Sequence, residues 1–126
     1  MTPSDIVNPA YRAVVENTFA ADAALDAVRF VSILTPDAVF QLGGNPPVQG
    51  RESIQAVVAE VFRAFNSVNH TLRQAYELSS VLMYEADVRY DYRDGRVVTI
   101  PYANVLQFTG DRVHGYRIYI DLSSLT

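Results

Sequence analysis

The sequence predicts an α+β fold in which helices pack on one side of a curved antiparallel sheet. Two observations support this fold class. Apolar residues recur at helical spacing in the first half of the chain, whereas from Val68 onward they alternate with polar residues at the period of a strand. Helices first and strands later are typical of α+β domains. At 126 residues, we expect one domain that spans residues 1–126.

Two helices are expected in the first third of the chain. The first begins at Asn8 and Pro9, because Asn caps helix N-termini and Pro suits the first helical position. A second, shorter helix follows Asp26 as its cap and stops near Pro36. The first helix presents one apolar face, made of Tyr11, Val14, Val15 and Thr18.

A strand, a loop and a third helix follow. DAVFQL, residues 37–42, predicts a short strand, and GGNPPVQG, residues 43–50, is too rich in Gly and Pro for regular structure. The third helix carries a long apolar stripe that is expected to lie against the sheet. Its members are Ile54, Val57, Val58, Val61, Phe62 and Phe65.

Four runs with a period of two make up the second half of the chain. They cover roughly residues 68–77, 81–92, 97–108 and 113–121, and short polar turns separate them. Consecutive strands with short turns predict an antiparallel meander.

The turn Asp94-Gly95 predicts how the second and third runs pair. A two-residue turn pairs Asp91 with Val98. Residues that pair across two strands lie on the same face of the sheet. One face then combines the charged residues of EADVRYDY with apolar ones: Glu85, Asp87, Arg89, Asp91, Val98, Ile100, Tyr102 and Leu106. This face either lines a pocket or is a solvated strand end.

The opposite face is also largely apolar, with Tyr84, Ala86, Val88, Tyr90, Thr99, Pro101, Ala103 and Val105. Neither face suits bulk water, so we expect helices over one and a second copy of the chain over the other.

Composition limits the classes of partner. The net charge is −4 and the ten basic residues are scattered, which argues against nucleic acid. The chain has no cysteine, which favours a cytoplasmic location, and no apolar run approaches membrane-spanning length. No His, Asp and Glu cluster has metal-ligand spacing, and the Gly-rich loop lacks the lysine of a phosphate site. We expect a small-molecule ligand, without metal or other cofactor.

Seven short segments follow one another along the chain: LTPD, AVFQL, GRESI, VNHTL, DGR, PYANVLQF and YRIYIDL. Together they resemble the nuclear transport factor 2-like superfamily, in its SnoaL-like polyketide cyclase and ketosteroid isomerase-like branch, over roughly residues 9–123. The resemblance implies a cone-shaped sheet wrapped around three helices, a deep pocket at the open end and a homodimer through the outer sheet face.

The resemblance also allows an isomerase to be tested position by position. Ketosteroid isomerases use a tyrosine in the first helix, a carboxylate base just after the first strand and a carboxylic acid on the fifth strand. Thr18, Leu42 and Asn104 stand at those places, so that base is missing. Asn104 can still donate a hydrogen bond to a carbonyl oxygen.

Limonene-epoxide hydrolase offers a second comparison. Its Arg-x-Asp pair resembles Arg89 and Asp91, but its second aspartate falls at Ile118. Its water-positioning tyrosine and asparagine fall at Phe40 and Leu42, so only half of the hydrolase set is present. Arg89 and Asp91 can equally form a structural ion pair.

Cyclases and dehydratases of the superfamily often bring a histidine into the pocket, and His70 in VNHTL matches such a position. A histidine among apolar neighbours is as often structural. The last strand leaves two registers open: a two-residue turn puts Arg117 on the face of Asn104, whereas one further loop residue puts Ile118 there. The resemblance favours Ile118.

The predicted function is that of a small isomerase, cyclase or dehydratase acting on a mostly apolar carbonyl or hydroxyl compound. His70 and Asp91 are the catalytic candidates. The substrate-binding candidates are Arg89, Asn104, Tyr102, Phe40 and Ile118. The alternative is a non-catalytic module that holds a hydrophobic metabolite, or an assembly partner of a larger enzyme.

Overall fold

The computed structural model describes residues 1–125 and confirms the α+β class. The described elements are η1 (Pro3–Asp5), α1 (Pro9–Ala23), α2 (Ala27–Val31), β1 (Leu34–Leu42), β2 (Val48–Gln49), α3 (Arg51–Phe62), β3 (Phe65–Leu78), β4 (Val81–Tyr92), β5 (Val97–Thr109), β6 (Arg112–Ile120) and η2 (Leu122–Leu125). Among these residues, no helix is both long and apolar enough to cross a membrane.

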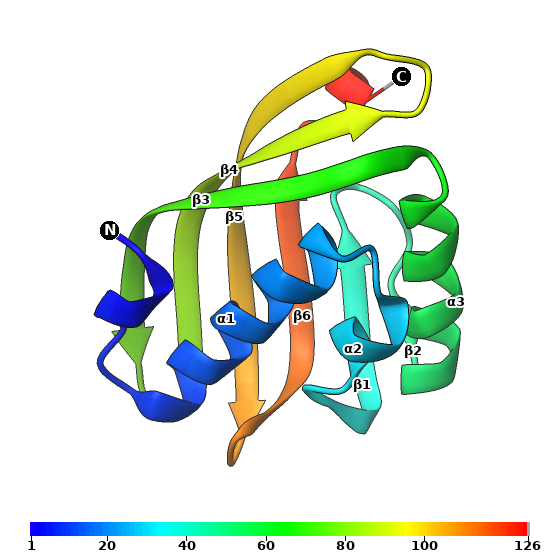
Figure 1. Cartoon of the computed structure of the whole chain (residues 1–126). Coiled ribbons are helices and arrows are strands. Elements are labelled where there is room, and N and C mark those ends of the chain that lie inside the picture. Colours follow the sequence, from blue (N-terminus) through cyan, green and yellow to red (C-terminus); the bar gives the residue numbers. More distant parts are fainter. Residues whose placement is uncertain (126) are drawn as a thin grey trace.

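One six-stranded sheet, in the order β2-β1-β6-β5-β4-β3, forms the body of the molecule (Figure 1). The predicted meander of β3 to β6 is antiparallel, as expected. The sheet as a whole is mixed, because β1 runs parallel to β6. This pairing needs the long crossover that α3 and the meander provide, which a sequence pattern does not specify.

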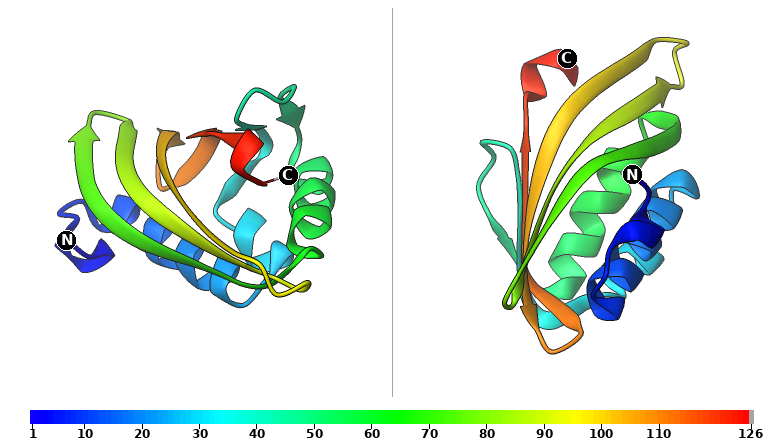
Figure 2. Two further views of the ribbon diagram at one scale, coloured as in Figure 1. Left: turned by 90° about the horizontal axis from the view of Figure 1, so that it is seen from above. Right: turned by 90° about the vertical axis from the view of Figure 1, so that its left-hand side faces the viewer.

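The sheet curves around the helices, which all cover its concave side (Figure 2). Register shifts lie in β3, between Phe65 and Ser67 and between Leu72 and Gln74, and such bulges bend a strand. The core fills the space between α1, α3 and the sheet, and Val15, Ile54 and Leu106 are completely buried in it. The expected cone of sheet around three helices is therefore present.

The helix starts follow the expected capping chemistry. The Asn8 side chain accepts hydrogen bonds from the backbone N–H groups of Ala10 and Tyr11, and Pro9 is the first residue of α1. Asp26 caps α2 by accepting from the N–H of Arg29 at 3.0 Å.

Some boundaries differ from the prediction. The second helix ends at Val31, and Pro36 lies inside β1, which begins at Leu34. The apolar stripe of α3 buries Ile54, Val58 and Phe62, whereas Phe65 begins β3 instead of continuing the helix.

The predicted register between β4 and β5 is wrong by one residue. Asp91 pairs with Val97 and Val88 pairs with Ile100, because the loop contains three residues. The backbone N–H of Tyr92 bonds the carbonyl of Arg96 at 2.9 Å, and Gly95 adopts a positive φ of 94°. A three-residue loop that ends in such a residue is a common hairpin connection.

A one-residue slip exchanges the two faces of a strand relative to its partner. The even-numbered face of β5, with Ile100, Tyr102 and Asn104, therefore joins Val88 and Tyr90 of β4 on the concave side. The charged residues Glu85, Asp87, Arg89 and Asp91 lie on the outer side with Val97, Thr99, Pro101 and Ala103.

Candidate functional site

Two adjoining cavities lie between the helices and the concave face of the sheet. The first has a volume of about 70 Å³ and the second about 50 Å³. Asp22, Phe30, Tyr90 and Ile118 line both cavities. The site is therefore one apolar region with a polar end.

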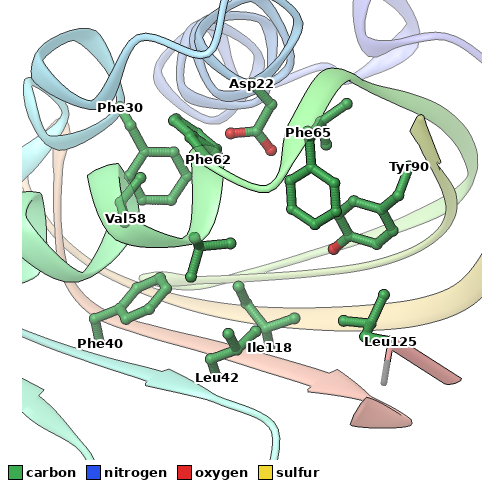
Figure 3. A pocket seen from close by; sticks show the side chains of 12 residues that line it. Asp22, Phe30, Phe40, Leu42, Val58, Phe62, Phe65, Tyr90, Ile118 and Leu125 are labelled. Atoms are coloured by element: carbon green, nitrogen blue, oxygen red, sulfur yellow. The ribbon is translucent and has the colours of Figure 1, made fainter. Parts of the chain in front are cut away.

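The walls of the first cavity are mostly aromatic and aliphatic (Figure 3). The labelled side chains in the figure are Asp22, Phe30, Phe40, Leu42, Val58, Phe62, Phe65, Tyr90, Ile118 and Leu125. Asp22 is the one ionisable carboxyl group among the described residues that line this cavity, and it points into the cavity from α1.

The second cavity contains a chain of three hydrogen-bonded side chains. Asp22 Oδ2 lies 2.5 Å from His70 Nε2, and His70 Nδ1 lies 2.7 Å from the hydroxyl oxygen of Tyr102. These residues come from the last turn of α1, from β3 and from β5. The ring of Phe19 stacks on the imidazole at 4.7 Å between centroids and fixes its plane. Both nitrogens of His70 are thus engaged.

The second carboxylate oxygen of Asp22 has no such partner. Asp22 is 8% exposed, and its Oδ1 is a buried atom with no hydrogen-bond partner in the described part of the chain. A buried acceptor without a donor is costly, so a ligand donor that reached this atom would stabilise the site. Oδ1 is the candidate reactive atom of the site.

Three tyrosines and an asparagine continue the polar end. Asn104 Nδ2 donates to the hydroxyl of Tyr84 at 2.7 Å and to that of Tyr116 at 3.4 Å. Burial raises the pKa of Tyr84, and hydrogen bonding with Tyr116 and Tyr102 acts to lower it by less. The resemblance suggested that Asn104 donates a hydrogen bond to a ligand, but its N–H groups are engaged by these tyrosines. Its unpartnered atom is the buried Oδ1.

Burial keeps these hydroxyls protonated. Desolvation raises the pKa of Tyr84 to about 12 and raises the pKa of Tyr102 and of Tyr116 well above 10, with the Asp22 charge adding to each. Burial likewise raises the pKa of Tyr90. At neutral pH, these hydroxyls can donate hydrogen bonds to an oxygen but cannot act as phenolate bases.

These raised pKa values predict a loss of stability in alkali. Above pH 10, the ordinary tyrosine pKa, the unfolded chain releases phenolic protons that the folded chain retains. The stabilisation is complete below pH 10 and is lost as the pH rises towards the folded-state value of about 12. We expect phenolate absorbance and circular dichroism to show these tyrosines ionising together with unfolding. Ionisation of all eight tyrosines near pH 10 in an intact fold would contradict this prediction.

The predicted site residues divide into two groups. His70, Tyr102 and Asn104 lie together in the second cavity, Phe40 lines the first, and Ile118 lines both. Ile118 pairs with Asn104 across β5 and β6, so the register that the resemblance favoured is the observed one.

The prediction that Arg89 and Asp91 line the pocket with these residues is wrong. Both lie on the outer face of β4, and the Arg89 side chain is 58% exposed. They form an ion pair at 3.3 Å, and a hydrogen bond from Ser67 and the Arg89 guanidinium hold the pKa of Asp91 below its ordinary value. Their geometry is that of a surface ion pair.

Sequence reasoning missed Asp22 and placed Tyr84 on the outer face of the sheet. Asp22 continues the apolar face of α1 one turn beyond Thr18, and an acidic residue on the buried face of a helix is the signal that identifies it. In ketosteroid isomerases the carboxylate stands at the position of Leu42. Leu42 lines the cavity but has no ionisable group. Here α1 supplies the carboxylate instead.

Residues 13–116 match the sequence profile of the SnoaL-like domain family. No curated protein sequence matches the chain significantly.

Solved structures share the fold. A Catenulispora acidiphila protein with a ketosteroid isomerase-like fold, in complex with trimethylamine, has a TM-score of 0.82 at 20% identity, covering 94% of this chain and 90% of that one. A Jannaschia sp. CCS1 protein named for its likeness to SnoaL-like polyketide cyclases has a TM-score of 0.80 at 16% identity, with coverages of 96% and 94%. An LEH-like epoxide hydrolase of M. tuberculosis has a TM-score of 0.74 at 14% identity, with coverages of 89% and 83%. At these identities the likeness shows the fold and transfers no activity.

Proposed function

The chain belongs to the SnoaL-like domain family, and we propose that it is a small-molecule enzyme that transfers a proton. The substrate is a mostly apolar carbonyl or hydroxyl compound, and the reaction is of the isomerase, cyclase or dehydratase type. The observation that carries the proposal is the unpartnered carboxylate oxygen of Asp22, which belongs to a side chain held against His70 at the junction of the apolar first cavity and the polar second one.

The chemistry follows from the roles that these groups can take. Asp22 Oδ1 accepts a proton from an acidic C–H or O–H bond of the substrate, and the electron pair of that bond remains on the substrate as an enolate or alkoxide. The Tyr116 hydroxyl, which lines the second cavity and is kept protonated by burial, donates to the developing negative charge. Return of the proton from Asp22 to a different substrate atom completes an isomerisation, and its delivery to a leaving hydroxyl completes a dehydration.

His70 positions the carboxylate. With Tyr102 donating to Nδ1, the neutral imidazole carries its proton on Nε2 and donates it to Asp22 Oδ2. This bond holds the carboxylate in the cavity lining with Oδ1 unpartnered, and it leaves no ring nitrogen for the substrate. We therefore assign direct proton transfer to Asp22 rather than to His70.

Hydrogen–deuterium exchange tests this proposal without knowledge of the natural substrate. A panel of apolar ketones and hydroxyketones is incubated with the protein in D₂O, and NMR follows deuterium uptake next to the carbonyl group. We expect at least one compound to exchange faster than in buffer alone. Compounds that bind in the cavity without any enhanced exchange would contradict proton transfer.

The second candidate function is binding without turnover. The apolar lining of the first cavity favours it, since this lining suits any hydrophobic metabolite of matching size. The Catenulispora acidiphila neighbour holds trimethylamine, which is consistent with ligand storage in this fold. The exchange experiment separates the two functions, because a binding module leaves the ligand unlabelled.

We also propose that the protein forms a homodimer through the outer sheet face. Tyr84, Val88 and Tyr90, which the sequence assigned to that face, lie on the concave side. The outer face instead carries an apolar row across β3, β4 and β5, in which Met83 pairs with both Tyr76 and Val105. Exposed apolar patches of this kind often mark interfaces.

Light scattering tests the dimer. We expect twice the chain mass of 14.0 kDa at micromolar concentration, and Met83→Asp should shift the protein towards the monomer because it places a charge in the apolar row. Val28→Asp, at an exposed site on α2, is the matched control and should leave the mass unchanged. A wild-type monomer would overturn the proposal.

A further inference from the structure

We propose that this site recognises its ligand through a neutral hydroxyl group that donates to Asp22 Oδ1, and that the site rejects anionic ligands. The inference rests on the proposed function in so far as the cavities must accept a ligand, and it goes further by naming the group that the ligand presents.

The hydrogen-bonding capacity of the cavity is unbalanced. Asp22 Oδ1 and Asn104 Oδ1 are both buried acceptors without a partner in the described part of the chain. Both residues line the second cavity, where Asn104 is 2% exposed and Asp22 is 8% exposed. The nitrogen donors around them are already engaged, since His70 donates to Asp22 and Asn104 Nδ2 donates to Tyr84, and the Tyr90 and Tyr116 hydroxyls line the cavity without donating to either acceptor. A ligand hydroxyl satisfies one of these two acceptors, whereas an ether or ester oxygen leaves both unsatisfied.

The charge of the cavity also favours a neutral ligand over an anionic one. Asp22 is acidic, and among the described residues that line either cavity His70 is the only basic side chain, already held by the carboxylate. The chain contains no lysine, and the arginine side chains lie outside both linings. A carboxylate or phosphate on the ligand would therefore meet a buried negative charge without a counter-ion, and its desolvation would go uncompensated.

The shape of the walls favours a flat ring as the apolar part of the ligand. Phe65 and Tyr90 stack at 4.7 Å between centroids on one side of the first cavity, and Phe30 and Phe40 lie edge to face at 6.0 Å on the other. Aromatic walls contact planar aromatic compounds efficiently. A hydroxylated aromatic ring, with its hydroxyl at the junction of the two cavities, satisfies all three features.

Calorimetry with three naphthalenes that differ in a single substituent tests the proposal on the full chain at neutral pH. We expect 2-naphthol to bind about ten- to a hundredfold more tightly than 2-methoxynaphthalene, because one hydrogen bond to a charged group is lost in the ether. We expect no binding of 2-naphthoate at concentrations where 2-naphthol saturates the site.

Two variants locate the effect at the proposed atom. Asp22→Asn should reduce the preference for 2-naphthol over its methyl ether to less than about threefold and should allow 2-naphthoate to bind, because the charge is gone. Asp91→Asn makes the same chemical change on the outer face and should keep the wild-type order of the three ligands.

The outcomes separate this inference from the proposed function. Equal binding of 2-naphthol and its methyl ether to the wild-type protein, or tighter binding of 2-naphthoate, overturns the donor rule and leaves proton transfer intact. No binding of any naphthalene overturns the inference of a hydroxylated aromatic ligand, whereas the proposed function is overturned only by the exchange experiment. The wild-type series alone decides between these outcomes if Asp22→Asn does not fold.

Discussion

Asp22→Asn should lower the rate of deuterium exchange into a carbonyl substrate by about a hundredfold or more. An amide has nearly the shape of the carboxylate but cannot accept the proton, and a general base commonly contributes about 10²- to 10⁴-fold. The loss should appear in kcat, because the cavity walls that bind the apolar part of the substrate are unchanged. NMR exchange rates at saturating substrate measure this effect.

Asp91→Asn is the matched control for this experiment. Asp91 lies on the outer face of β4, where it accepts a hydrogen bond from Ser67 at 2.7 Å, so the substitution should leave exchange within about twofold of wild type. His70→Gln should weaken exchange by an intermediate factor, because it disturbs the position of the carboxylate without removing it. Full activity in Asp22→Asn together with complete loss in His70→Gln would transfer the base role to His70.

Val88→Asp should prevent stable folding. Val88 is 1% exposed on the concave face of β4 and pairs with Ile100. The substitution would place a second buried carboxylate in the lining that holds Asp22, beside a His70 that Asp22 already engages, and should cost more than about 4 kcal/mol, a large part of the stability of a domain this size. Thermal unfolding followed by circular dichroism should show no cooperative transition.

The neighbouring position provides the contrast. Arg89→Ala changes an exposed member of a surface ion pair and should alter the free energy of unfolding by less than about 1 kcal/mol. The two adjacent residues therefore report which face of β4 lies inside. A folded Val88→Asp variant combined with an unfolded Arg89→Ala variant would restore the register that the sequence first suggested.

Long elements with a strong period are predictable from this sequence. The face of α1 with Tyr11, Val14 and Val15 is buried, and the four alternating runs are the strands of the meander. Periodicity reports how residues within one element share a face, so it succeeds where the evidence is local. The parallel pairing of β1 with β6 joins segments far apart in sequence, and no local pattern carries that information.

The prediction of the register between β4 and β5 is wrong for a different reason. Both a two-residue and a three-residue loop are compatible with Asp94-Gly95, and they place opposite faces of β4 beside Tyr102. The sequence pattern correctly predicts that the face of β5 with Ile100 and Tyr102 lies on the pocket side, but it predicts the wrong face of β4 beside it. Counting charges would have favoured the observed register, because the alternative puts Arg89 and Asp87 inside without buried partners.

The candidate site was visible only in part. The family resemblance pointed to His70 in VNHTL and to Asn104, and the strand pattern pointed to Tyr102. Asp22 lies 48 residues from His70 in the sequence, and only the fold brings α1 against β3. An acidic residue on an apolar helix face was the one sequence feature that could have revealed it.

A structure of the protein with 2-naphthol bound tests the central claim most directly. We predict that the ring lies between Phe65 and Phe40 in the first cavity, with the hydroxyl oxygen within hydrogen-bond distance of Asp22 Oδ1. A ligand found on the outer face of the sheet, or one in the cavity whose hydroxyl bonds to His70 while Asp22 Oδ1 stays without a partner, would contradict the assignment of Asp22 as the group that meets the ligand.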